Sequence, residues 1–336
     1  MTRTIARAVP AILALTAAAA LAAGCGGSGG GGEKRIALVA FSTPKEAYEA
    51  LIPAFQRTAD GRGVEFTQSY GASGEQSRSV EGGLHADVVE FSLEPDVTRL
   101  VKAGLVAPSW NGGPHRGIVT DSVVVLATRK GNPRGIRGWS DLLKPGVEVI
   151  TPNPFTSGGA RWNIMAAYGS QIAQGASPAE AEQFLAKLFE NVAVQDKSAR
   201  DALQTFSSGK GDVLIAYENE AITARQKGIE LDYVVPRETI LIENPVAATL
   251  EPGDPEAAAA FVEFLYSPAA QAIFAQKGYR PVVEGTAGAE RYPKPAKLFT
   301  IAKFGGWSMV GDRFFDPQKG VVAKIEREKG VSTESG

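Results

Sequence analysis

The residues best suited to chemistry in this 336-residue chain are a hydroxyl and two glycines within NPFTSGGARWN, residues 153–163. Ser157, Gly158 and Gly159 precede a run of residues with helical character, so their backbone amides are expected at a helix N-terminus. The first four amides of a helix lack intrahelical partners, and glycine lets an anion approach them closely. The segment therefore predicts an anion-binding site, although an ordinary N-cap role for Ser157 explains the same tripeptide.

Three further helix starts can supply donors of the same kind. They lie at Thr43-Pro44, Ser73-Gly74 and Ser198-Ala199. Each helix N-terminus carries the equivalent of roughly half a positive charge, so four together approach the two negative charges of a tetrahedral divalent anion. The predicted site is therefore built from uncharged donors and needs no buried lysine or arginine.

Strand-like and helix-like segments alternate from residue 33 onward, which predicts an α/β protein with mostly parallel sheets. The expected strands cover residues 35–41, 63–70, 86–92, 122–129, 148–151, 192–195, 212–217, 231–236 and 244–250. The expected helices cover residues 44–58, 73–81, 95–103, 159–170, 178–189, 199–206, 257–266 and 268–277. The remainder is expected to form a packed tail that ends in a solvated helix. The strands fall into two groups, each of which needs its own covering helices.

A longer segment around the glycines, KPGVEVITPNPFTSGGARWN at residues 144–163, closely resembles the signature of the bacterial sulfate-binding proteins of ABC uptake systems. Other segments resemble the same family in the same order. They are SYGASGEQSRSV (69–80), ADVV (86–89), VLATRKGNP (125–133), GDVLIAYENEA (211–221), YSPAAQ (266–271), GYRP (278–281) and LFTIAKFGGW (298–307). The resemblance covers residues 36–315, and this colinearity is more specific than any single motif.

The resemblance implies the type II periplasmic binding protein fold, in which two α/β lobes close over a ligand in the cleft between them. By that resemblance, residues 33–121 and 245–336 form the first lobe and residues 122–244 form the second lobe. Residues 1–25 and 26–32 precede the lobes as a signal peptide with a lipobox and a glycine-rich tether.

The resemblance also implies a set of ligand residues that donate hydroxyl, amide and ring hydrogens to the anion. They are Thr43, Ser73, Ser157, Gly158, Gly159, Ala199 and Tyr217. Two of them depart from the family pattern. Thr43 stands where aspartate is usual, but there the backbone amide makes the contact. Tyr217 replaces a tryptophan whose indole N–H donates to the ligand, and a core aromatic role for Tyr217 stays open.

Donor counting predicts that this site prefers sulfate to phosphate. Sulfate at neutral pH only accepts hydrogen bonds, whereas phosphate keeps a proton that needs an acceptor. We therefore expect no carboxylate directly around the anion. Arg161, Arg200 and Glu218 lie near ligand positions and are expected to pair behind the site or at the hinge, with plain surface ion pairs as the alternative.

The function implied by the resemblance is extracytoplasmic capture of sulfate and its delivery to the transmembrane subunits of an ABC permease. Thiosulfate or a sulfonate is the alternative substrate, because related thiosulfate binders carry other residues at position 217 and after Ser157. A surface module without a small ligand is a third possibility. The protein is expected to act as a monomer.

The N-terminus predicts export, because Arg3 and Arg7 precede a short apolar run at residues 8–23. LAAGC, residues 21–25, resembles a lipobox, although Leu21 lies one place early. Cys25 is the only cysteine in the chain, so it is expected to carry a lipid that holds the protein at the outer face of the cell membrane. A periplasmic protein with a stray thiol is the alternative.

An exported serine hydrolase is the rival from the enzyme class, with Ser73 or Ser157 as nucleophile. The chain has two histidines, His85 and His115, and neither lies in a recognisable catalytic motif. We therefore expect no enzyme activity, no catalytic residues, no cofactor and no metal. With 35 basic and 37 acidic residues, net charge gives no reason to expect nucleic-acid binding.

Overall fold

The computed structural model describes residues 34–292 and 294–333, which belong to one unit of the chain. The predicted signal peptide, Cys25 and the glycine-rich tether lie outside the described residues. Their predicted roles therefore stay predictions.

The first part of the chain forms a parallel sheet with β1 in the middle. The strands are β1 (Arg35–Phe41), β2 (Glu65–Gly71) and β3 (Val88–Glu90), and β1 pairs with both neighbours. The helices are α1 (Lys45–Gln56), α2 (Ser73–Glu81) and α3 (Glu94–Lys102). After its first residue β1 is buried throughout, as expected for a central parallel strand that is covered on both faces. These elements are called the N-terminal group.

The middle of the chain repeats this arrangement, and its elements are called the central group. Its strands are β5 (Val149–Pro152), β6 (Val192–Asp196), β7 (Val213–Tyr217) and β8 (Leu231–Val234). Its helices are α4 (Gly158–Gln174), α5 (Pro178–Glu190), α6 (Ala199–Ser207) and α7 (Glu218–Gln226), preceded by a 3-10 helix at Trp139–Leu143. Strand β5 pairs in parallel with β6 and β7.

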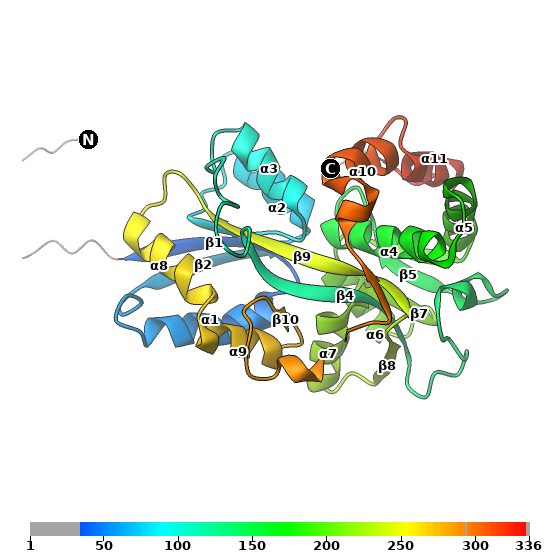
Figure 1. Ribbon diagram of the computed structural model, residues 1–336, viewed down its shortest axis with the longest axis horizontal. Coiled ribbons are helices and arrows are strands. Elements are labelled where there is room, and N and C mark those ends of the chain that lie inside the picture. Colours follow the sequence, from blue (N-terminus) through cyan, green and yellow to red (C-terminus); the bar gives the residue numbers. More distant parts are fainter. Residues whose placement is uncertain (1–33, 293, 334–336) are drawn as a thin grey trace, which may run out of the picture. The chain divides into compact units, whose positions relative to one another are not determined.

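Two long strands, β4 (Ile118–Arg129) and β9 (Glu238–Ala248), join the two groups. They pair antiparallel with each other, β9 pairs with β3, and β4 pairs with β7, which gives the order β2-β1-β3-β9-β4-β7-β5-β6. Figure 1 shows β4 and β9 running side by side from one group to the other. The expected parallel pairing therefore holds for β1 to β3 and for β5 to β7, while the crossing strands pair antiparallel and β8 pairs antiparallel with β4.

The end of the chain returns to both groups. Helices α8 (Pro255–Leu265) and α9 (Pro268–Gln276) pack with α1 and β1 in one apolar cluster. Later come β10 (Arg280–Pro281), β11 (Lys297–Phe299), α10 (Gly306–Val310), a π-helical turn at Gly311–Phe315 and α11 (Val321–Glu328). No single described helix is long and apolar enough to cross a membrane, and α8 with α9 meets that test only as a pair bent by 62°.

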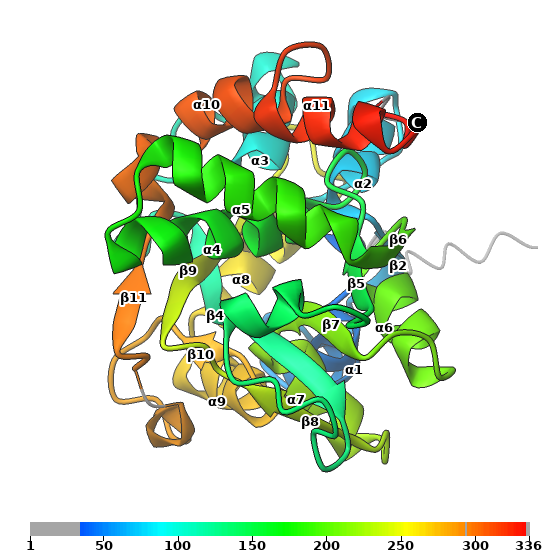
Figure 2. The ribbon, with the colours of Figure 1, turned by 90° about the vertical axis from the view of Figure 1, so that its right-hand side faces the viewer.

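The tail from β11 onward packs in the apolar cluster of α4 and α5, although the predicted boundary gives it to the first lobe. Figure 2 shows α11 lying beside α5, which it contacts. Helix α11 buries Val322, Ala323 and Ile325, so it is amphipathic, whereas a solvated helix was expected. The division of the chain between lobes stays a prediction.

Candidate anion site

Four helices start where the sequence analysis expected donors. Helix α1 follows β1, α2 follows β2, α4 follows β5 and α6 follows β6. The first helical residues are Lys45, Ser73, Gly158 and Ala199, each within two residues of the predicted start. Loops at the carboxyl ends of the strands in such sheets are the usual place for a ligand.

These helix starts lie close together. Arg200, the second residue of α6, donates from Nη2 to the carbonyl oxygen of Ser42 at 2.8 Å, which joins α6 to the start of α1. A cavity of about 540 Å³ is lined by Ser42, Ala72 and Ser198, so it touches the starts of α1, α2 and α6. A methyl group added at Gly74 would lie 3.2 Å from the carbonyl oxygen of Thr156, which joins α2 to α4.

The start of α4 has free hydrogen-bond donors. Ser157 is the N-cap residue and is buried, yet its side chain caps no amide of its own helix. The first turn of α4 contains no acidic residue that could occupy those amides. Gly158 lies against the turn between β3 and α3, since a Cβ there would fall 2.9 Å from Ser92 Oγ. Gly159 lies beside Tyr217, whose hydroxyl would be 3.7 Å from its added Cβ.

Ser73 lies at the junction, but its hydroxyl is already hydrogen-bonded. It donates to Asp96 Oδ2 at 2.5 Å and accepts from the Ser92 amide at 2.9 Å. Donation to an anion therefore requires the hydroxyl hydrogen to turn away from Asp96. Burial raises the pKa of Asp96, while the Ser73 bond and the charge of Arg161 lower it by less. The Asp96 carboxylate thus lies behind Ser73, a predicted ligand residue, and is hydrogen-bonded to it. It was not predicted from the sequence.

Tyr217 ends β7 and is fully buried, with 1% of its surface exposed. Its hydroxyl lies 2.7 Å from Ser92 Oγ, which joins the central group to the N-terminal group. Burial raises the pKa of Tyr217 well above its ordinary value, and hydrogen bonds with Ser92 and Asn244 oppose that shift. Ser92 and Asn244 were not among the predicted ligand residues, although Ser92 is the last residue of a predicted strand.

Thr43 and Ala199 lie on the other side of the junction. Thr43 is buried and lines a second cavity, of about 290 Å³, together with Glu46, Arg200 and Glu220. Ala199 opens α6 behind Ser198, whose hydroxyl accepts from the amide of the third helical residue. Burial raises the pKa of Glu220 to about 7, against the opposing effect of its bond from the Tyr217 amide.

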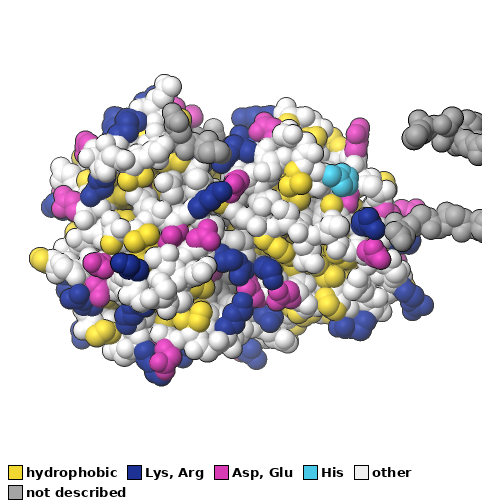
Figure 3. Space-filling model, turned by 180° about the vertical axis from the view of Figure 1, so that it is seen from behind, with side chains coloured by type: hydrophobic (Ala, Val, Ile, Leu, Met, Phe, Trp, Pro, Cys, Tyr) yellow, Lys and Arg dark blue, Asp and Glu magenta, His cyan; other side chains and the backbone are white. Residues whose placement is uncertain are grey.

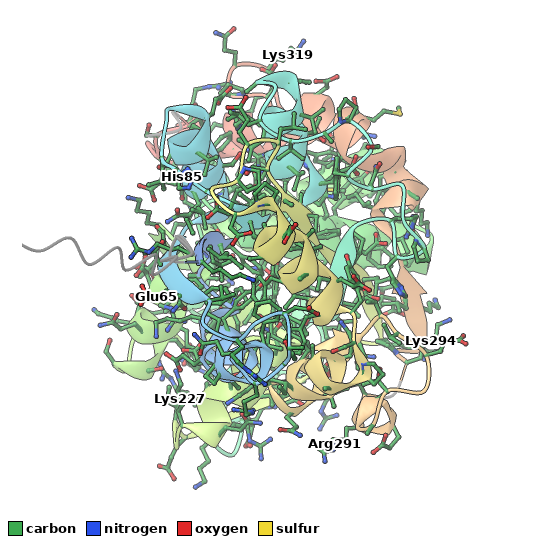
Figure 4. The ribbon with its side chains drawn as sticks, turned by 90° about the vertical axis from the view of Figure 1, so that its left-hand side faces the viewer. Glu65, His85, Lys227, Arg291, Lys294 and Lys319 are labelled. Atoms are coloured by element: carbon green, nitrogen blue, oxygen red, sulfur yellow. The ribbon has the colours of Figure 1, made fainter. Side chains whose placement is uncertain are left out.

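Charged side chains around the junction are paired with one another. Arg200 makes two bonds of 2.9 Å to Glu46, and Lys227, labelled in Figure 4, also bonds to Glu46. Glu218 pairs with Arg280 at 2.8 Å. Arg200 and Glu218 thus each form an ion pair, with Glu46 and Arg280 respectively. The place of these pairs behind the site stays a prediction.

Arg161 makes a different contact. Its Nε donates to the carbonyl oxygen of Pro154 at 2.8 Å, and its guanidinium lies 5.1 Å from the centre of the Phe315 ring. Lys197, just before α6, pairs with Glu75 of α2 at 2.6 Å. Over the face shown in Figure 3, acidic and basic side chains are interspersed. No group of three potential metal ligands occurs in the described part of the chain.

The described contacts of the two histidines are with other residues than the candidate nucleophiles. His85, labelled in Figure 4, lies 3.1 Å from Asp87. His115 stacks on Tyr266 with ring centres 5.1 Å apart. The described bonds of the Ser73 hydroxyl go to Asp96 and the Ser92 amide instead. In the described part of the chain, neither histidine forms a hydrogen bond with Ser73 or Ser157, the candidate nucleophiles.

Comparison with known proteins places this geometry in a family. Residues 36–280 match the family of bacterial extracellular solute-binding proteins. The sulfate-binding protein of Synechococcus elongatus is 44% identical over 291 residues, 83% of each chain. The thiosulfate-binding protein of Pseudomonas aeruginosa is 35% identical over 292 residues, 82% of this chain and 88% of that one.

A solved structure is similar over the same region. The sulfate-binding protein SubI from Mycobacterium tuberculosis H37Rv has a TM-score of 0.82 and 45% identity, and the match covers 84% of this chain and 100% of that one. The predicted two-lobed type II periplasmic binding protein fold is thereby confirmed. The chain belongs to the bacterial extracellular solute-binding proteins, among the relatives named sulfate-binding proteins.

Proposed function

We propose that this protein is exported, captures sulfate in the junction between its two groups of elements, and delivers it to the transmembrane subunits of an ABC permease. The observation that carries the proposal is the meeting of the starts of α1, α2, α4 and α6, with uncapped amides at Gly158 and Gly159. Relatives that are named sulfate-binding proteins support the choice of anion.

The charge of the anion is balanced by helix dipoles and hydrogen bonds. Four N-termini supply the equivalent of roughly two positive charges. The proposed donors are the hydroxyls of Ser73 and Ser157, the side chain of Tyr217, and backbone amides. The amides are those of Thr43, Gly158, Gly159 and Ala199. The nearby cations Arg200 and Lys197 bond to carboxylates instead.

Selectivity follows from the shortage of acceptors. A protonated phosphate needs an acceptor for its P–OH, and leaving that bond unmade in a buried site costs about 1 to 3 kcal/mol. Asp96 is the nearest carboxylate to a proposed donor, but Ser73 lies in front of it. We therefore expect sulfate to bind more tightly than phosphate.

Thiosulfate or a sulfonate is the alternative ligand. Two observations favour keeping it: the 35% identity to a thiosulfate-binding protein and the tyrosine at position 217. A tyrosine hydroxyl both donates and accepts, whereas an indole N–H only donates. Catalysis is not part of the proposal, because no histidine contacts Ser73 or Ser157 in the described part of the chain.

Capture requires the two groups to close on the anion. Only the closed arrangement brings donors from α1 and α2 together with donors from α4 and α6, so the anion stabilises closure. The closed monomer then docks on the permease. A lipid on Cys25, with residues 26–32 as tether, would hold the protein beside its membrane partner.

A panel of anions tests the proposal. Calorimetry and thermal unfolding are measured with sulfate, thiosulfate, phosphate, molybdate and small sulfonates. The expected result is one sulfate per chain, tight binding and a raised unfolding temperature that phosphate does not reproduce. No response to any anion would rule out the uptake role, and tighter binding of thiosulfate or a sulfonate would replace the proposed substrate.

A further inference from the structure

Ser92 lies in the turn between β3 and α3 and is fully buried. Its amide donates to Ser73 Oγ at 2.9 Å. Its carbonyl oxygen accepts from Trp162 Nε1 at 2.8 Å and from Asn244 Nδ2 at 3.0 Å. Its hydroxyl lies 2.7 Å from the Tyr217 hydroxyl. Residues from α2, α4, β7 and β9 therefore fix the position of one serine side chain.

That position lies among the proposed ligand residues. A methyl group added at Gly158, the first residue of α4, would lie 2.9 Å from Ser92 Oγ. Ser73 and Tyr217 contact Ser92 directly, and Gly159 adjoins Tyr217. The Ser92 hydroxyl is thus beside the free amides of α4, although the predicted ligand set omits it.

The direction of the bond between the two hydroxyls follows from their acidity. They lie 2.7 Å apart, and the distance alone allows either one to donate. A phenolic hydroxyl is more acidic than an aliphatic one and is the better donor, which directs the Tyr217 hydrogen to Ser92 Oγ.

The Ser92 hydrogen is then left for the ligand. In the described residues the Ser92 hydroxyl bonds to no side chain other than Tyr217. We propose that Ser92 donates directly to the bound anion, and that Tyr217 orients the Ser92 hydroxyl by donating to Ser92 Oγ. This inference rests on the proposed function and adds a ligand residue to that site. Ser92 then replaces Tyr217 as the side-chain donor, because the single hydroxyl hydrogen of Tyr217 goes to Ser92.

The direction of this bond has a consequence for selectivity. With the Tyr217 hydrogen directed to Ser92 Oγ, the Ser92 hydroxyl offers its own hydrogen to the site. In this chain Ser92 and Tyr217 together thus supply one donor. In the family that this chain resembles, the indole N–H of a tryptophan at position 217 supplies it. The arrangement suits an anion that only accepts hydrogen bonds.

A double-mutant cycle measured by calorimetry with sulfate tests the proposal. Ser92→Ala is expected to weaken binding about tenfold or more, since it removes a donor to a charged ligand. Tyr217→Phe keeps Ser92 but removes the hydroxyl that orients the Ser92 O–H, and about a threefold loss of sulfate affinity is expected. The double variant should bind within about twofold of Ser92→Ala alone, because the two side chains act in series.

Other outcomes overturn the proposal. Unchanged affinity in Ser92→Ala would show that Ser92 makes no bond to the anion. A larger loss in Tyr217→Phe than in Ser92→Ala, or additive losses, would show that Tyr217 contacts the anion itself. Ser92→Cys keeps the side-chain volume with a weak donor and should show the same loss as Ser92→Ala, so it repeats the test if the alanine variant folds poorly.

Ser170→Ala is the matched control. Ser170 is a buried serine further along α4 whose hydroxyl bonds to the Ala167 carbonyl oxygen at 2.7 Å, and its variant should bind sulfate as the unmodified protein does. If the unmodified protein binds no sulfate, the proposed function fails. If it binds sulfate and Ser92→Ala binds equally well, only the role of Ser92 fails.

Discussion

Gly158 stands where α4 meets the turn between β3 and α3, and it has no room for a side chain there. A Cβ would lie 2.8 Å from Leu93 Cδ2 and 2.9 Å from Ser92 Oγ. Distances under about 3 Å between such atoms require the neighbours to move. At the residue scale, the missing side chain therefore allows both the approach of an anion and the contact between the two groups.

Gly158→Ala is expected to weaken sulfate binding by about tenfold or more, because the methyl group opposes closure. If the groups separate without the anion, the unfolding temperature measured without sulfate should change little. Gly113→Ala is the control, because a methyl group there meets open space. Equal affinities in the two variants would contradict the role given to Gly158.

Ser157→Ala distinguishes the two roles that the sequence left open for Ser157. An N-cap serine replaced by alanine typically costs about 1 kcal/mol of stability. Since Ser157 caps no amide, its variant should keep its unfolding temperature and bind sulfate about tenfold more weakly. Ser177→Ala is the matched control, because Ser177 does cap α5 and should lose stability with unchanged binding. A destabilised Ser157→Ala with full affinity would favour the capping role.

At the scale of elements, short-range signals explain which predictions succeeded. Helix α2 spans the expected residues 73–81, and α4 and α6 begin within one residue of their predicted starts, because serine, glycine and strand ends mark them locally. Helix α7 was missed because it follows β7 without a loop and is capped by Glu220 bonding back to the Tyr217 amide. No serine, threonine or glycine marks that start.

The site was predictable to a similar degree. Residues within the family motif were named from sequence, whereas Ser92, Asp96 and Asn244 were not. Ser92 and Asp96 meet Ser73 and Tyr217, and Asn244 meets Ser92, only in the fold, across sequence separations of 19 to 152 residues. The antiparallel crossing of β4 and β9 is a long-range pairing of the same kind.

Strand β3 carries a buried carboxyl that makes stability depend on pH. Burial raises the pKa of Glu90 to about 8, although its bond with Tyr48 lowers it. The folded pKa exceeds the ordinary value of 4.5, so the stabilising contribution is complete below about pH 4.5 and is lost as pH rises through about 8.

Thermal unfolding between pH 5 and 9 checks this. The unfolding temperature should fall as pH rises toward about 8 and level off above it, and Glu90→Gln should flatten the fall because its side chain cannot ionise. Glu65→Gln, at an exposed position on β2 labelled in Figure 4, should behave as the unmodified protein. Identical pH profiles for Glu90→Gln and the unmodified protein would contradict the assignment.

At the scale of the whole folded unit, ion pairs bridge the two groups on both sides of the proposed site. Glu46 of α1 pairs with Arg200 of α6, and Glu75 of α2 pairs with Lys197 before α6. Burial alone would raise the pKa of Glu46, but bonds from Arg200 and Lys227 and the charge of Arg200 lower it to about 2. If closure on the anion forms these bridging pairs, as proposed, it is coupled to the ionisation of Glu46.

The folded pKa of Glu46 lies below its ordinary value of 4.5, so its contribution is present above about pH 4.5 and is lost as pH falls toward 2. Sulfate affinity, measured by calorimetry, should fall between pH 5 and 3. Glu46→Gln should bind more weakly at pH 7 and show a flatter pH dependence. Glu230→Gln removes an exposed ion pair with Lys130, which follows β4. This variant should change neither the affinity at pH 7 nor its pH dependence. The same response in both variants would argue against a bridging role.

The account depends on uncharged donors at the junction of four helix starts, and a crystal structure with selenate, located by its anomalous scattering, tests this directly. The predicted map places one anion at the starts of α1, α2, α4 and α6, within hydrogen-bond distance of the Gly158 and Gly159 amides. No lysine or arginine nitrogen should contact it. An anion held instead by the guanidinium of Arg200 or Arg161, or bound away from the glycines, would contradict the account.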